Sequence, residues 1–285
     1  MKIKNYKRFS PHIIKQLLFE ENIRRYQGLF RVLPDFMIVG AQKAGTTSLF
    51  HYLKQHPQII DSNPSEVHFF DYKYQKGLLL YKSYFPTKIE IEQQQNNLNR
   101  KVITGETSPS YLFYPFVAKR IAKTLPKIKI IILLREPIAR AYSHYQHEVR
   151  KGRETLSFVK AISREKNGEV IRKYQSGKYS NYQYACRSYM ARSRYIEQVK
   201  DYYQLFNPEN ILVLSSEEFF SHTQITYDKV INFLGLKPYT ITDKKARNVG
   251  CYKKNIIPLE EDLRSYYQPY NQQLFEFLQQ DFSWD

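Results

Sequence analysis

The stretch that decides the fold is Asp35-Phe36-Met37-Ile38-Val39-Gly40-Ala41-Gln42-Lys43-Ala44-Gly45-Thr46-Thr47-Ser48. The apolar run from Phe36 to Val39 predicts a buried strand. Residues Thr46 to Gln55 have the composition of a helix, and Pro57 stops it. The glycine-bounded loop between strand and helix is typical of an anion site, because loop amides and the helix dipole both point at a bound phosphate.

The loop differs from a nucleotide P-loop in the place of its lysine. Gly40 and Gly45 keep the glycine spacing of G-x-x-x-x-G-K-[ST], but Thr46 stands where that pattern has lysine, and Lys43 lies inside the loop. A kinase or ATPase needs the lysine on the β- and γ-phosphates and a hydroxyl on Mg²⁺, so this loop fits a nucleoside triphosphate poorly. An ordinary strand-to-helix turn is the alternative, but it would not need a lysine and two threonines together. The predicted anion-binding residues are Gln42, Lys43, Ala44, Gly45, Thr46, Thr47 and Ser48.

The net charge of the chain indicates which classes of partner it can bind. The 285 residues can bury one substantial α/β core, and 44 Lys and Arg against 27 Asp and Glu give a net charge of +17. The partner is therefore expected to be anionic: a nucleic acid, an acidic polysaccharide, an anionic membrane or a phosphorylated cofactor. The 25 tyrosines stack on sugars and bases alike, so they do not separate these classes.

The two cysteines, Cys186 and Cys251, are far apart in sequence, which fits a reducing compartment better than a disulfide framework. With no apolar run of about 18 residues and no signal peptide, a soluble, cytoplasmic protein is expected. Residues 1–34 are predicted to form a basic helical extension and residues 35–285 the main domain. The extension is either a packed helix or a peripheral membrane anchor.

A second motif, Glu66 and His68, places a carboxylate and an imidazole two residues apart. In an extended segment both side chains would lie on one face, with Val67 on the other. Near the anion loop they can take a proton from an acceptor hydroxyl, and Phe69 and Phe70 would anchor the segment. The alternative is a solvated glutamate beside a structural histidine.

A third motif follows the most apolar run, Ile128 to Leu134, which predicts a central parallel strand. Arg135 comes directly after it, where open α/β sheets bind ligands, and Pro137 to Arg150 predicts a helix. Ser143 lies two turns along that helix, so one phosphate can meet both side chains. A helix-capping role for Arg135 is the alternative.

The remaining chain predicts an α/β, P-loop-like, three-layer fold with a central, mostly parallel sheet flanked by helices, and no second domain boundary. Strands are expected at Lys101–Gly105 and Ile211–Leu214, and residues Ile89–Arg100 are expected to be an exposed connection. Helices are expected at Tyr72–Phe85 (one or two), Pro115–Thr124, Leu156–Phe206 (two), Ile225–Leu234 and Pro258–Gln279.

From Phe36 to its end the chain resembles the sulfotransferases, most closely the heparan sulfate N- and 3-O-type. Four segments carry the resemblance, in the family's order: the Lys43 loop, Glu66 to Asp71, Leu134 to Ser143, and Pro269 to Trp284. The resemblance implies a donor, 3′-phosphoadenosine 5′-phosphosulfate, that is used without a metal. Its sulfuryl group would pass in line to a hydroxyl or amine of an acceptor, most consistently a glycan, rather than to a nucleic acid.

The resemblance also implies roles for single residues. Glu66 would be the base, Lys43 would neutralise charge on the sulfate and leaving oxygen, and His68 would be a second base or would orient Glu66. Arg135 and Ser143 would hold the 3′-phosphate. The segment with Tyr252, Lys253 and Lys254 resembles the family's cofactor loop, whose disulfide has at most one counterpart here, Cys251.

Two departures limit the resemblance. Thr107 replaces the lysine that relatives acting on heparan carry, and the membrane-spanning segment of the Golgi members is missing. A soluble enzyme of bacterial type is the simpler expectation. Two other functions stay open: a P-loop-type nucleotide kinase, and a non-enzymatic polyanion-binding protein whose binding would depend steeply on salt.

Overall fold

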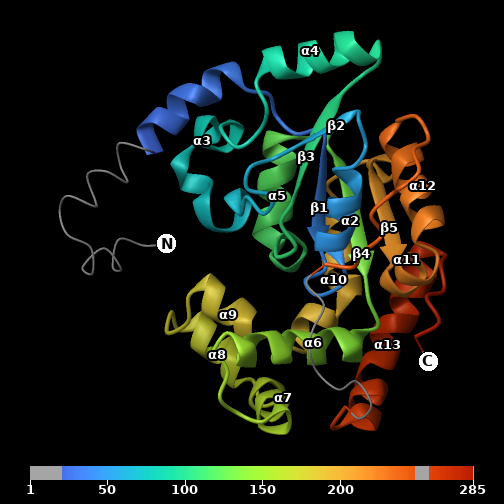
Figure 1. Ribbon diagram of the computed structural model, residues 1–285. Coiled ribbons are helices and arrows are strands. Elements are labelled where there is room, and N and C mark those ends of the chain that lie inside the picture. The colour runs from blue at the N-terminus through green and yellow to red at the C-terminus, as the bar shows by residue number, and fades with distance from the viewer. Residues whose placement is uncertain (1–20, 248–256, 285) are drawn as a thin grey trace.

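A five-stranded parallel sheet forms the centre of the protein (Figure 1). The structure is a computed structural model that describes residues 21–247 and 257–284. The strands are β1 Phe36–Gly40, β2 Ile59–Asp61, β3 Ile103–Thr107, β4 Lys129–Leu134 and β5 Ile211–Ser215, in the order β2-β3-β1-β4-β5. The predicted α/β fold with a parallel sheet is therefore confirmed.

Burial on both faces explains why β1 and β4 read as continuous apolar runs. Every residue of β1 is buried, and β4 is buried from Ile130 to Leu134. β1 is the middle strand, and Phe36 lies beside Gly105 of β3 and Lys129 of β4. The run predicted as the central strand, β4, lies next to it. Both strands end at the same edge of the sheet, so their following loops meet there.

Helices cover both faces of the sheet, which gives the three layers. α2 and α12 contact each other on one face, and α5 and α10 contact each other on the other (Figure 1). The helices are α2 Thr46–Leu53, α3 Leu78–Lys82, α4 Lys88–Leu98, α5 Pro115–Thr124, α6 Pro137–Arg150, α7 Phe158–Lys166, α8 Glu169–Gln175, α9 Asn181–Arg187, α10 Tyr195–Tyr203, α11 Ser216–Ser221, α12 Thr223–Leu234 and α13 Glu260–Leu278. The short turns are the 3-10 segments η2 Gly28–Phe30, η4 Tyr74–Lys76, η5 Tyr111–Phe113, η6 Ala191–Ser193 and η7 Pro208–Asn210, and the π-helix η3 Phe69–Lys73.

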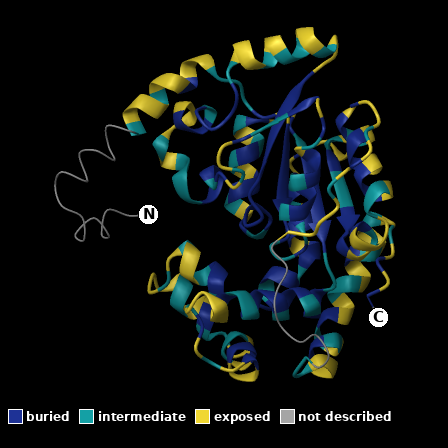
Figure 2. Ribbon diagram, viewed as in Figure 1, coloured by how far each residue is buried: buried dark blue, intermediate teal, exposed yellow. Residues whose placement is uncertain are grey.

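A second, smaller core lies below the sheet in the view of Figure 1, where α6 to α9 gather. It joins Ile138 of α6, Phe158 of α7, Tyr189, and Leu263 and Tyr267 of α13. Figure 2 shows the buried strands and the exposed outer faces of the helices around them. The helices that follow β4 thus bring α6 against the carboxyl edge of the sheet.

The expected exposed connection at Ile89–Arg100 is wrong, because these residues form α4. Thr87 and Glu90 make a capping box: the Thr87 hydroxyl accepts from the Glu90 amide, and the Glu90 carboxylate accepts from the Thr87 amide. The glutamine-rich stretch is exposed, as expected, but glutamine is a good helix former once the first turn is capped.

Residues Leu156–Phe206 form four helices, not two. Gly168 and Gly177 both take a positive φ, which ends one helix and turns the chain toward the next. Ser157 and Ser180 cap α7 and α9 by accepting backbone amides. The strand expected at Lys101–Gly105 is also displaced, since β3 runs from Ile103 to Thr107.

The N-terminal part is described from residue 21, where a helix over residues 21–27 leads into η2. No helix among the described residues is long and apolar enough to cross a membrane. The division of the chain after residue 34 stays a prediction.

Candidate active site at the carboxyl edge of the sheet

The loop after β1 has the backbone shape that an anion site needs. Lys43 has φ 72° and Gly45 φ 99°, so the chain turns sharply before α2 begins at Thr46. A side chain at Gly45 would also meet the Phe220 ring at 2.8 Å, so only glycine fits there. Arg135 Nη1 donates to the Lys43 carbonyl at 3.1 Å, and Ser216 Oγ donates to the Ala44 carbonyl at 2.7 Å. The loop is therefore held by its carbonyls.

The first turn of α2 supplies the donors. Gly45, its N-cap, carries no side chain that could cap the helix, so the first N–H groups are left for a ligand. Thr46 is buried and Thr47 is half-buried in this first turn. Free N–H groups and hydroxyls are donors that a sulfate or phosphate group can accept from, and the binding of such a group by residues 42–48 stays a prediction.

Lys43 is the centre of positive charge in the site. Burial and the nearby charges of Arg150 and Arg135 together lower the pKa of Lys43 to about 8, although the charges of Glu66 and Glu148 oppose the change. Arg135 follows β4, and Glu148 and Arg150 lie on α6. Glu66 lies in the turn from Glu66 to Asp71, which we call the catalytic turn after its proposed role. A bound anion would favour the charged form of the lysine, so donor binding and Lys43 protonation should support each other.

Glu66, His68 and Asp71 form a line of alternating charge beside Lys43. His68 Nε2 lies 3.4 Å from the Glu66 carboxylate, and His68 Nδ1 lies 2.9 Å from Asp71 Oδ2. The segment is not extended as expected, because His68 takes a left-handed conformation with φ 53°. That turn still points both side chains together, since Val67, Phe69 and Phe70 are buried under it.

The two carboxylates decide the charge of His68. Burial alone would lower its pKa, but the hydrogen bonds with Asp71 and Glu66 and their charges raise the pKa of His68 to about 9. His68 is therefore an imidazolium at neutral pH, which donates at both nitrogens and cannot accept a proton. Of the two candidate bases, Glu66 is therefore the one that can accept a proton. Its Oε2 atom faces His68, and its side chain is 45% exposed.

A buried carboxylate, Glu106 of β3, supports this turn from below. Tyr81 Oη and Ser108 Oγ donate to it at 2.6 and 2.7 Å. Ser108 Oγ in turn accepts the His68 amide at 3.1 Å, and Tyr111 Oη accepts the Phe69 amide at 2.7 Å. No role was predicted for Glu106, and a carboxylate at the end of a predicted strand was the available signal in the sequence.

α6 presents a third group of residues to the site. Glu136 caps the helix by accepting the Ile138 and Ala139 amides, and Ser143 is buried within it. His147, one turn beyond Ser143, has its pKa lowered to about 4 by burial and by the charge of Lys43. The sequence analysis missed His147, although Ser143, His147 and Arg150 share the helical spacing i, i+4, i+7.

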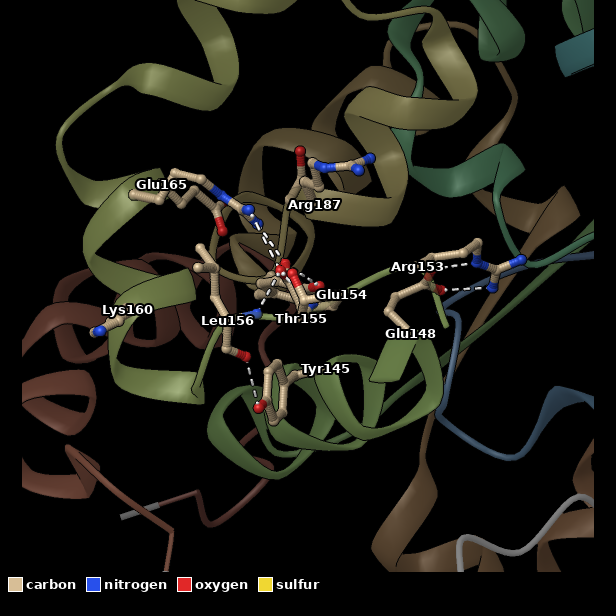
Figure 3. Close-up of polar contacts among 12 residues, drawn as sticks. Tyr145, Glu148, Arg153, Glu154, Thr155, Leu156, Lys160, Glu165 and Arg187 are labelled. Carbon is tan, nitrogen blue, oxygen red and sulfur yellow. Dashed lines mark hydrogen bonds and ion pairs between the residues drawn. The ribbon is translucent and has the colours of Figure 1, made fainter. Parts of the chain in front are cut away.

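The connection from α6 to α7 positions a further arginine. Figure 3 shows Arg153 paired with Glu148 of α6, and Arg153 Nε and Nη2 donate to its two oxygens at 2.6 and 2.9 Å. In the same view Glu154 turns back to accept the Thr155 and Leu156 amides, and Tyr145 donates to the Leu156 carbonyl. The loop is thus fixed at the α6 end, where the charge of Arg150 acts on Lys43 and the charges of Arg150 and Arg153 both act on His147.

Ser48 has a different environment from the other loop residues. Its hydroxyl accepts the Arg247 amide at 2.9 Å and lies 3.3 Å from the Arg247 carbonyl, so α2 is tied to the segment at residues 237–247. Tyr252, Lys253 and Lys254 follow that segment but lie outside the described residues. Their part in donor binding, like those of Ser48 and Ser143, stays a prediction.

Comparisons with known proteins agree with this geometry. A family model described as "Sulfotransferase domain" matches residues 33–249. Among curated relatives, the membrane-associated sulfotransferase kil1 of Dictyostelium discoideum is 23% identical over 90% of this chain and 68% of its own length. Mouse heparan sulfate glucosamine 3-O-sulfotransferase 3A1 is 27% identical over 89% of this chain and 65% of its own length.

Two further relatives cover different shares of their own chains. The mouse bifunctional heparan sulfate N-deacetylase/N-sulfotransferase 4 is 31% identical over 73% of this chain, which spans only 23% of that protein. A crystal structure of a sulfotransferase from Alicyclobacillus acidocaldarius is 32% identical over 89% of this chain and 99% of its own, with a TM-score of 0.69. The family match excludes the two other functions considered for the sequence, a nucleotide kinase and a non-enzymatic polyanion-binding protein. The chain belongs to the sulfotransferase family and is a transferase that moves sulfuryl groups.

Proposed function

We propose that this enzyme transfers the sulfuryl group of 3′-phosphoadenosine 5′-phosphosulfate to a glycan hydroxyl or amine, with Glu66 as the base. When bound, the donor supplies the sulfuryl group and leaves as the 3′,5′-bisphosphate. The loop from Gln42 to Ser48 would hold the 5′-phosphosulfate, and Arg135 with Ser143 the 3′-phosphate. The geometry of the loop, with Arg135 fixed to the Lys43 carbonyl, supports this assignment.

The observation that carries the proposal is the Glu66–His68–Asp71 line beside Lys43. Glu66 accepts the proton of the attacking acceptor atom as that atom bonds to sulfur. His68 keeps its own protons and holds the Glu66 carboxylate in place, with buried Asp71 behind it. Lys43, as a cation, stabilises the negative charge that grows on the leaving oxygen, a contribution typically of about 10²–10³ in rate.

A carbohydrate acceptor is proposed because two relatives are named for transfer to heparan sulfate. Thr107, which stands where such relatives carry lysine, is buried, and its hydroxyl has no hydrogen-bond partner within residues 21–247 and 257–284. We therefore propose a glycan other than heparan sulfate. A reducing, cytoplasmic location is part of the proposal, because two cysteines far apart in sequence, Cys186 and Cys251, fit a reducing compartment better than a disulfide framework.

The test is transfer of labelled sulfate from the donor to a panel of glycans, phenols and lipids, with three enzymes. Wild type should label an acceptor without added metal. Glu66→Gln should lower kcat by about 10²–10⁴ because it removes the base but keeps its shape. Arg135→Ala should weaken binding of the 3′,5′-bisphosphate by about 1.5–3 kcal/mol, measured by calorimetry, because a charge-assisted contact to phosphate is lost.

Calorimetry on Glu66→Gln separates the base from a binding role. Affinity for the bisphosphate should stay the same or rise slightly, since one negative charge near the anion is gone. Near-normal turnover of Glu66→Gln would exclude Glu66 as the base. Equal stabilisation by ATP with Mg²⁺ and by the bisphosphate would contradict the proposed donor.

A further inference from the structure

An exposed apolar surface lies at the N-terminal end of the described chain. Tyr26 is 73% exposed, Phe30 69% and Leu29 52%, and Ile23 lies one turn before Tyr26. Residues 23, 26 and 30 are spaced i, i+3, i+7, so they follow one face of the helix and the turn after it. Apolar residues at this spacing normally face a core, but here all three are exposed.

A second element extends the same surface. Gly28 packs so closely on α3 that a side chain there would lie 2.0 Å from the Leu79 carbonyl oxygen. Leu78 and Leu79, both 40% exposed, are therefore neighbours of Leu29 and Phe30. We call these six residues the N-terminal apolar patch: Ile23, Tyr26, Leu29, Phe30, Leu78 and Leu79.

Positive charge borders the N-terminal apolar patch. Arg24 is exposed and lies over the Tyr84 ring, and Lys82 ends α3. The acidic residue at the start of the helix, Glu21, is already paired with Arg25 at 3.1 Å and with Lys76. The surplus charge here is positive, as it is over the whole chain at +17.

We propose that the N-terminal apolar patch binds the surface of an anionic lipid bilayer. Aromatic and aliphatic side chains with arginine and lysine beside them are the combination that binds the interface of such membranes. A protein partner with an acidic rim is the competing occupant. Apolar insertion beside lysine and arginine on lipid phosphates needs no shaped groove, so the bilayer is the occupant proposed.

Contacts connect the patch to the turn that carries Glu66 and His68. Arg24 and Lys73 both lie over the Tyr84 ring, at 5.8 and 5.1 Å. Lys73 Nζ donates to the Val67 carbonyl at 2.8 Å, between Glu66 and His68. A bilayer bound to the patch would thus lie near Lys73, the residue that holds the Val67 carbonyl of this turn.

The test is cosedimentation of the full chain with vesicles of phosphatidylcholine containing about 30% phosphatidylserine, and with pure phosphatidylcholine. Wild type should bind the anionic vesicles and lose most binding at high salt. The double variant Leu29→Ser/Phe30→Ser should bind at least tenfold more weakly. The control Ile171→Ser/Ile225→Ser removes two exposed apolar residues from α8 and α12 and should bind as wild type does.

Other results would overturn the proposal. Equal binding by wild type and the patch variant, or equal binding to neutral and anionic vesicles, would do so. Concentration-dependent dimerisation that the patch variant abolishes would assign the surface to a second copy of the chain. Should Leu29→Ser/Phe30→Ser fail to fold, Tyr26→Trp gives an independent measurement, because its fluorescence must be quenched by spin-labelled lipid in anionic vesicles. Absence of quenching would also overturn the proposal. Bisphosphate affinity serves as the folding control and is independent of the membrane result.

Discussion

Single residues in this site owe their chemistry to neighbours that are distant in sequence. His68 is a cation because the hydrogen bonds and charges of Asp71 and Glu66 outweigh its burial, and Lys43 is a weakened cation because it is buried and Arg150 and Arg135 approach it. His147 carries no charge at neutral pH because it is buried and lies near the charge of Lys43. The site thus places the positive charges of Lys43 and His68 beside Glu66, which suits a base that works next to a sulfate.

Glu106 gives a pH-dependent prediction at this scale. Burial raises the pKa of Glu106 to about 7 from 4.5, although hydrogen bonds from Tyr81 and Ser108 oppose the rise. Between these values the unfolded chain loses a proton that the folded protein keeps, so this residue's stabilising contribution is full below pH 4.5 and falls as pH rises to about 7. Glu106→Gln removes that loss.

Urea unfolding of wild type and Glu106→Gln between pH 4.5 and 8 checks this prediction. As pH rises to about 7, the free energy of unfolding of the variant should increase relative to that of wild type by on the order of 3 kcal/mol. Above that pH the difference between the two proteins should stay constant. Turnover should fall as well, because Ser108 holds the His68 amide. Parallel pH curves for the two proteins would show that Glu106 is ionised throughout.

Among the elements, α2 does more than present its first turn to an anion. The helix and the turn after it bind the segment at residues 237–247: Tyr52 donates to the Lys244 carbonyl at 2.8 Å. Gln55, two residues after the end of α2, accepts the Thr242 and Asp243 amides at 3.1 and 2.9 Å. Gln55 also donates to the Asp243 carbonyl. The helix of the anion loop therefore holds the chain that leads to the predicted donor residues Tyr252, Lys253 and Lys254.

Gln55→Ala tests this coupling. Two backbone amides would lose their partner, at a cost of about 1–3 kcal/mol each where water does not replace it. Hydrogen exchange at Thr242 and Asp243 should become about tenfold faster or more, and bisphosphate affinity should fall. Gln272→Ala is the matched control, since the exposed Gln272 of α13 donates to Glu276 of the same helix at 3.1 Å. Unchanged exchange at Thr242 would contradict the coupling.

At the scale of the whole molecule, the net charge of +17 acts on an anionic donor before it reaches the site. Increasing KCl from about 0.1 M to about 1 M shortens the Debye length from about 10 Å to about 3 Å. The association rate of the 3′,5′-bisphosphate should then fall by about tenfold, measured by stopped flow, with a smaller change in its dissociation rate. An association rate that does not depend on salt would show that the net charge of the chain does not attract the donor, and that only the loop does.

The sequence by itself determined the parallel sheet, the loop after β1 and the helices α5, α6 and α12, because each rests on local signals: an apolar run, a glycine, a proline at the first turn. It also named Lys43, Glu66, His68 and Arg135. Local signals do not report what a side chain meets across the fold. Only the tertiary structure therefore decided that His68 is charged, that Glu106 lies buried under the catalytic turn, and that an apolar stripe at residues 23–30 faces outward. Each depends on burial and on charges brought together from separate elements.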